Sequence, residues 1–237
     1  MTDETYVNIR ALSSEITSCI NCPRLVQHRE LIARIRRRSF MAEKYWGKPV
    51  SGFGDPLGRL LIVGLAPAAH GANRTGRVFT GDQSARFLMR GLKAAGFANQ
   101  SHSEHLHDGL QLHDTYITCA VKCVPPDNKP TSQERQQCQH YLEREIAALC
   151  NIKIVLTLGR LAFSAYYAAT VGTDKSQKEP RFTHGERYIF APNQPSIYGS
   201  FHPSPRNTNT GLLTQSSFEK VLSDIRAELD ASLPKSS

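Results

Sequence analysis

Four cysteines are spaced so that their sulfur atoms could bind a metal ion or an iron–sulfur cluster. Cys19 and Cys22 form a close pair with two residues between them, and Cys123 and Cys138 form a wider pair much later in the chain. Two such pairs, brought together by folding, supply the four thiolates of a tetrahedral site. The spacing therefore predicts a site that ties distant segments together, and it leaves both zinc and iron–sulfur open.

The remaining cysteine usage argues against a disulfide-bonded scaffold. Six cysteines in 237 residues are too few and too unevenly spread for a secreted disulfide framework. We recognise no secretory signal and expect an intracellular protein. Free cysteines in such proteins are often small buried apolar side chains, and we assign that role to Cys150, which follows the apolar stretch 147–149.

The charge balance favours an anionic partner. The formal net charge is +8, from 29 Lys and Arg residues against 21 Asp and Glu residues. The basic run at 34–38, followed by Lys44, is typical of phosphate contact, although a solvated helix face explains it equally well. No run approaches the ~20 apolar residues of a membrane span, so we expect no membrane partner.

Alternating apolar strands and amphipathic helices predict a three-layer α/β domain around a parallel sheet. The expected strands are residues 60–64, 116–118, 152–158 and 196–198. The expected helices are 84–95, 131–149 (opened by a capping box at Thr131 and Glu134), 159–169 and 218–229, and a small hairpin pairs 181–182 with 188–190. We expect one domain over residues 1–230 and a loose tail at 231–237.

Three polar loops directly follow predicted strands. They begin at Gly64, at Cys119 and at Phe201. Ligands of open parallel sheets bind beyond the carboxyl ends of the strands, so the three loops should converge on one pocket.

Two of these loops carry side chains that suit a planar ligand and its phosphates. The glycine-rich loop 64–82 allows close backbone approach, and its Phe79 could stack on a ring or, alternatively, anchor the loop in the core. The loop 202–211 offers His202, one arginine and several short hydrogen-bonding groups. A lone histidine is often simply a satisfied polar residue, but its position after a strand favours a functional role for His202.

Together, the loop 64–82, the HPSPRNTNTG loop at 202–211 and the four cysteines resemble the family 5 uracil-DNA glycosylases. The similarity runs from the CINCPRL segment at 19–25 to Gly211 and includes YWG at 45–47 and GFGDP at 52–56. This resemblance implies a central four-stranded parallel sheet and a [4Fe-4S] cluster on Cys19, Cys22, Cys123 and Cys138.

The resemblance also implies an activity in base excision repair. Such an enzyme flips deaminated bases, uracil and also hypoxanthine and other damaged bases, out of double-stranded DNA and hydrolyses the N-glycosidic bond, leaving an abasic site. We expect a monomer in the prokaryotic cytoplasm that associates with the nucleoid during repair.

The resemblance assigns roles to individual residues. His202 would stabilise the departing base anion, and Phe79 would stack on the flipped base. The other expected contacts are Gly64, Ala66, Pro67 and Cys119 to the base, and Ser204, Arg206 and Asn207 to the DNA.

The chain departs from the wider superfamily at two places. Leu65 and Ala66 are apolar where many relatives have a polar side chain that positions water, which leaves Asn73, or else Asp82, for that task. Asp82 could instead cap the following helix, which we favour. Cys119 replaces an asparagine that pairs with the base edge, and a weakly hydrogen-bonding thiol there predicts a looser pocket with a broader substrate range.

Two other functions remain as alternatives. One is a non-catalytic nucleic-acid-binding protein stabilised by zinc on the four cysteines. The other is a hydrolase or nucleotide-binding enzyme that acts on small molecules, which would be active on free nucleosides and would not need Arg206.

Overall fold

A six-stranded sheet forms the centre of the protein, whose computed structural model describes residues 2–171 and 178–232. The strand order is β1-β3-β2-β4-β6-β5. The four middle strands are parallel: β3 (Thr115–Cys119), β2 (Leu60–Gly64), β4 (Ile154–Leu158) and β6 (Ser196–Ser200). The short strands β1 (Phe53–Gly54) and β5 (Arg187–Tyr188) extend it antiparallel at the two edges. The expected four-stranded parallel sheet is confirmed.

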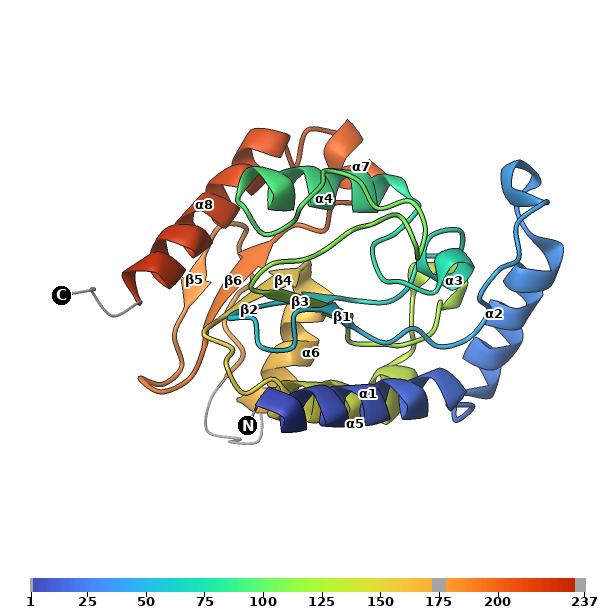
Figure 1. Cartoon of the computed structure of the whole chain (residues 1–237), viewed down its shortest axis with the longest axis horizontal. Helices are drawn as coiled ribbons and strands as arrows, with labels where there is room; N and C mark the ends of the chain where they lie inside the picture. Colours follow the sequence, from blue (N-terminus) through green and yellow to red (C-terminus); the bar gives the residue numbers. More distant parts are fainter. Residues whose placement is uncertain (1, 172–177, 233–237) are drawn as a thin grey trace.

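Helices cover both faces of the sheet and complete the three layers (Figure 1). One face carries α4 (Gln83–Ala94) and α8 (Gln215–Ala231), which pack against each other. The other face carries α1 (Thr2–Ser18), α5 (Ser132–Ala148) and α6 (Arg160–Thr170). The predicted α/β class is therefore confirmed.

The apolar run of β2 explains why the sheet is buried on both faces. Leu60 and Ile62 belong to one core cluster, with Phe218 of α8, whereas Leu61 and Val63 belong to the other. Successive side chains of a strand point to opposite faces, so a strand between two helical layers must be apolar at every position.

The two expected helix caps are also confirmed. Thr131 forms both hydrogen bonds of a capping box with Glu134 at the start of α5. Asp82 caps α4, because its Oδ1 accepts a hydrogen bond from the backbone N–H of Ala85 at 2.8 Å. Each cap pairs backbone N–H groups that the first helical turn leaves without partners.

The sequence analysis did not anticipate the N-terminal helices. Helix α1 packs against α5, and α2 (Pro23–Ile35) projects beside the sheet. Proline at the first position of α2 is a recognised start signal for a helix. The remaining elements are single turns: η1 (Arg38–Phe40), α3 (Ala72–Thr75), η2 (Pro126–Asn128) and α7 (Pro205–Asn209).

Two local predictions were wrong. The expected hairpin between residues 181–182 and 188–190 does not form, because Tyr188 pairs with Ile197 of β6. The Tyr188 hydroxyl still contacts the segment 181–182, where it donates a hydrogen bond to the carbonyl of Arg181 at 2.9 Å. Cys150 is exposed rather than buried, since it follows the last turn of α5 at the surface.

The C-terminal boundary is close to the expected one. Helix α8 continues to Ala231, one residue beyond the expected end of the domain, and residues 233–237 of the expected tail lie outside the described part of the chain. Among the described helices, none is long and apolar enough to cross a membrane.

Candidate active site

A cleft of about 840 Å³ opens at the carboxyl ends of the parallel strands. All three predicted loops contribute to its lining. The lining residues from these loops include Leu65, Ala66, Pro67, Phe79 and Asp82, then Cys119, and then His202, Ser204 and Pro205. The expected convergence of the loops on one pocket is confirmed, and the cleft lies within the size range of small-molecule sites.

Phe79 and His202 lie side by side in this cleft. Their ring centroids are 6.1 Å apart, and the ring planes are inclined by 34°. Gly64 lets Phe79 approach the end of β2, because a Cβ at Gly64 would lie 2.9 Å from Cε2 of Phe79 and 3.2 Å from Sγ of Cys119. Phe79 also packs against the core, so its role as an anchor of the loop is confirmed, and its stacking on a ligand ring stays a prediction.

Burial keeps the two titratable groups beside Phe79 neutral. Desolvation lowers the pKa of His202 to about 4 and raises the pKa of the Cys119 thiol to about 12. At neutral pH the site therefore presents an uncharged imidazole and an uncharged thiol. A neutral imidazole can still donate one hydrogen bond to a developing anion.

The neutral state of His202 can be observed directly. We expect its ring protons, followed by NMR across a pH titration of the free protein, to shift with a midpoint near pH 4. A midpoint near 6.5 for His202 would show that the imidazole is not desolvated.

The loop after β6 is held by its own polar side chains. Ser204 caps α7, and the side-chain amide of Asn207 donates a hydrogen bond to the carbonyl of His202 at 2.8 Å. Asn207 thus holds the backbone of His202. Arg206 is exposed and does not line the cleft. Contact of Ser204, Arg206 and Asn207 with DNA stays a prediction.

Asn73 lies outside the cleft. Its side chain is buried in α3, only 1% exposed, and its amide donates to the backbone carbonyl of Arg29 at 3.2 Å. Asp82 does line the cleft, with a pKa that burial raises, while it caps α4 as expected. The geometry therefore corrects the expected position of Asn73, because the turn of α3 directs its side chain toward α2.

Other residues of the cleft were missed by the sequence analysis. Arg37, Phe40 and Asn128 line the cleft from outside the three loops, and His70 lines it from within the loop 64–82. Asn128 has a left-handed backbone, with φ of 56°, at the end of the turn that follows the two prolines. The PPDN sequence signals this turn, but only the fold brings it to the cleft.

A second hollow gathers the four predicted ligand cysteines. Cys19, Cys22, Cys123 and Cys138 all line it, together with apolar residues of the surrounding helices. Two donors point at the sulfur atoms: the Arg29 guanidinium lies 3.1 Å from Sγ of Cys123, and the backbone N–H of Lys122 lies 3.3 Å from Sγ of Cys138.

This donor set fits a thiolate-bound cluster, whose sulfurs accept such hydrogen bonds. No group of three or more His, Cys, Asp or Glu side chains in the described ranges is arranged to hold a metal ion. The cofactor therefore stays a proposal.

A buried ion pair lies at the short segment between the cleft and the hollow. The ammonium of Lys122 lies 2.6 Å from Oε2 of Glu145 and donates to the carbonyl of Cys119 at 2.7 Å. Both side chains are almost fully buried. The short segment 119–123 therefore joins a cleft residue to a cysteine of the hollow.

The comparisons with known proteins agree with this geometry. The family model of the Uracil DNA glycosylase superfamily matches residues 51–226, which is most of the chain. The chain belongs to this superfamily.

Within the superfamily, the chain is similar to proteins named type-5 uracil-DNA glycosylase and to others named type-4 uracil-DNA glycosylase. One from Thermus thermophilus is 43% identical over 91% of this chain and 96% of its own length. Another from Pyrobaculum aerophilum is 42% identical over 92% and 91%. A type-4 uracil-DNA glycosylase from Sulfurisphaera tokodaii is 30% identical over 73% and 72%. The resemblance seen in the sequence motifs is confirmed as membership of the type-5 family.

Proposed function

We propose that this protein is a DNA glycosylase that releases uracil from double-stranded DNA and leaves an abasic site. One observation carries the proposal: Phe79 and His202 lie side by side in a cleft at the carboxyl ends of the strands, with Cys119 beside Phe79. This is the arrangement needed to stack on a flipped base and to hydrogen-bond to its edge.

His202 supplies the main chemical contribution in this mechanism. As the N-glycosidic bond breaks, positive charge develops on the sugar and negative charge on the departing uracil. The neutral imidazole donates a hydrogen bond to the uracil oxygen that gains this charge. Water then adds its oxygen to the sugar carbon, and its proton leaves with the base.

Two side chains of the cleft are candidates for orienting the attacking water. Asp82 and Asn128 both line the cleft, whereas Asn73 does not. The neutral amide of Asn128 can orient water but is a poor base, and the carboxylate of Asp82 already caps α4. We therefore propose that stabilisation of the leaving group dominates the rate acceleration.

The basic run near the cleft supports a DNA partner. Arg37 lines the cleft, and Arg38 is exposed beside it on η1. This position beside the cleft supports the proposal that both guanidinium groups bind phosphates flanking the flipped nucleotide, and it favours phosphate contact over a simply solvated helix face. The proposed form is a monomer bound to nucleoid DNA.

Cys119 lets the pocket accept a broader range of bases than uracil alone. A thiol is a weak hydrogen-bonding group, so the base edge is read loosely, and hypoxanthine and other damaged bases are accepted as well.

Replacement of Cys119 by asparagine, which can pair with the base edge, should therefore raise the ratio of uracil to hypoxanthine release by roughly tenfold. The ratio is measured with two duplexes that differ only in the damaged base. Cys119→Ser, a near-isosteric control, should change it less. A ratio that stays the same in Cys119→Asn would show that this side chain does not face the base edge.

A [4Fe-4S] cluster on Cys19, Cys22, Cys123 and Cys138 is the proposed cofactor. Its support is the shared hollow and the two donors directed at Cys123 and Cys138. Such a cluster would cross-link the ends of α1 and α2 to the segment after β3 and to α5.

The proposed function is tested by base release from matched duplexes. The duplexes carry uracil, hypoxanthine, xanthine or hydroxymethyluracil at one position, and alkali cleavage reports the abasic product. We expect release from the uracil duplex and slower release from at least one other. Binding without release would favour the non-catalytic nucleic-acid-binding protein, and release from free nucleosides but not from DNA would favour the small-molecule enzyme.

A further inference from the structure

Phe79 adopts an unusual backbone conformation for an aromatic residue. Its φ angle is +48°, in the left-handed region that residues with a side chain rarely enter outside turns. Such conformations persist only where the surroundings hold them in place, and they cluster at functional sites. The structure must therefore contain contacts that hold the backbone on either side of Phe79.

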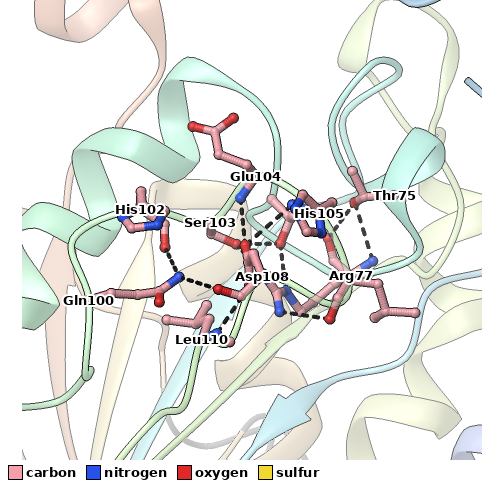
Figure 2. A network of polar contacts seen from close by, with 12 residues as sticks. Thr75, Arg77, Gln100, His102, Ser103, Glu104, His105, Asp108 and Leu110 are labelled. Carbon is pink, nitrogen blue, oxygen red and sulfur yellow. Dashed lines mark hydrogen bonds and ion pairs between the residues drawn. The ribbon is translucent and has the colours of Figure 1, made fainter.

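An ion pair holds the loop just before Phe79. The guanidinium of Arg77 donates to both carboxylate oxygens of Asp108, at 2.8 and 2.7 Å, and to the hydroxyl of Ser103 at 2.8 Å (Figure 2). Asp108 and Ser103 belong to the segment 99–113, which connects α4 to β3. This segment lies over the loop that carries Phe79.

Two further contacts hold the backbone just after Phe79. The hydroxyls of Thr80 and Ser103 are 2.6 Å apart, and the backbone N–H of Gly81 donates to the carbonyl of Ser103 at 2.7 Å. Ser103 thus contacts residues on both sides of Phe79, through Arg77 on one side and through Thr80 and Gly81 on the other.

The network is buried and permanently charged. The Arg77 and Asp108 side chains are 6% and 5% exposed. Burial alone would raise the pKa of Asp108, but hydrogen bonds from Arg77 and from the backbone N–H groups of Glu104 and Leu110 outweigh it and lower the pKa to about 2. Removal of the carboxylate charge would leave the Arg77 guanidinium buried without a counterion, which is strongly unfavourable.

We propose that the segment 99–113 is a brace that fixes Phe79 against the flipped base, with Asp108 and Ser103 as its positioning residues. This inference rests on the proposed function. Neither residue lines the cleft, so both act through the Phe79 loop rather than on the base. A displacement of about 1 Å in a stacking group can slow an enzymatic step by as much as 10²-fold.

A second arginine–aspartate ion pair, which is partly exposed, provides a control. The Arg59 guanidinium lies 2.6 Å from Oδ2 of Asp114, at the opposite end of the sheet, where Asp114 precedes β3. Asp114→Asn therefore removes a carboxylate partner of arginine away from the cleft. We expect Asp114→Asn to lower the stability of the protein and to leave the position of Phe79 unchanged.

The test compares Asp108→Asn and Ser103→Ala with Asp114→Asn and the wild-type protein. Uracil release is measured in single turnover at saturating duplex, together with affinity for the same duplex and with the melting temperature. We expect release by Asp108→Asn to fall by about tenfold or more, with duplex affinity within about threefold of wild type. Ser103→Ala should slow release by a smaller factor, and Asp114→Asn should keep the wild-type rate while its melting temperature falls.

The outcomes separate the brace from a general effect on stability. If folded Asp108→Asn and Ser103→Ala release uracil at the wild-type rate, or if Asp114→Asn slows release as much as Asp108→Asn does, the proposal is overturned. If Asp108→Asn does not fold, Ser103→Ala decides, since slower release supports the brace and an unchanged rate overturns it. Absence of release by the wild-type protein would instead reject the proposed function.

Discussion

Replacement of His202 by alanine is expected to slow uracil release by about 10²–10³-fold, the usual effect of removing one hydrogen-bond donor from a developing anion. Affinity for duplex DNA should stay nearly unchanged, because the imidazole is neutral and makes no contribution to phosphate binding. Single-turnover release and equilibrium binding, measured on the same duplex, separate the two effects.

Two control variants sharpen this experiment. His202→Asn keeps a neutral hydrogen-bond donor and should recover part of the rate. His140→Ala removes a half-buried histidine of α5 that does not line the cleft, and it should release uracil at the wild-type rate. Unchanged turnover in His202→Ala would remove the role assigned to this residue.

Replacement of Cys138 by serine is expected to have the second largest effect, on the cofactor and on the fold together. Cys138 lies on α5 and lines the hollow with the other three cysteines. Loss of one thiolate should abolish most of the visible absorbance and iron content of anaerobically purified protein. It should also destabilise the segment that begins at Lys122, because cluster binding energy is also folding energy.

Cys150→Ser is the matched control for this change. Cys150 is exposed after the same helix and does not line the hollow, so its replacement should leave absorbance, iron content and melting temperature unchanged. A wild-type protein that is stable, colourless and loaded with zinc would overturn the cluster proposal and support the other cysteine-bound metal that the spacing allows.

The parts of the fold that could be predicted from the sequence are those governed by local patterns. Residues 60–64 are apolar throughout because β2 is buried between two helical layers, and Thr131 with Glu134 marks the start of α5 unambiguously. The meeting of Phe79 and His202 was predictable for the same reason, because both residues lie in loops that follow parallel strands.

The remaining features depend on contacts between distant segments. Arg37 and Asn128 reach the cleft only because α2 and the turn after β3 pack opposite the strand ends. No local pattern distinguishes the buried amide of Asn73 from one that faces the cleft. Tyr188 pairs with β6 rather than with the segment nearest in sequence, since the edge of β6 offers free backbone groups.

The most direct measurement is the amount of free uracil released from a duplex that contains a single uracil, compared with the amount of alkali-labile strand in the same reaction. If the flipped base is held by Phe79 and His202 and hydrolysed from its sugar, the wild-type protein should produce equal amounts of free uracil and of alkali-labile strand. His202→Ala should produce much less of both. Tight binding of the duplex with neither free uracil nor alkali-labile strand would contradict this mechanism.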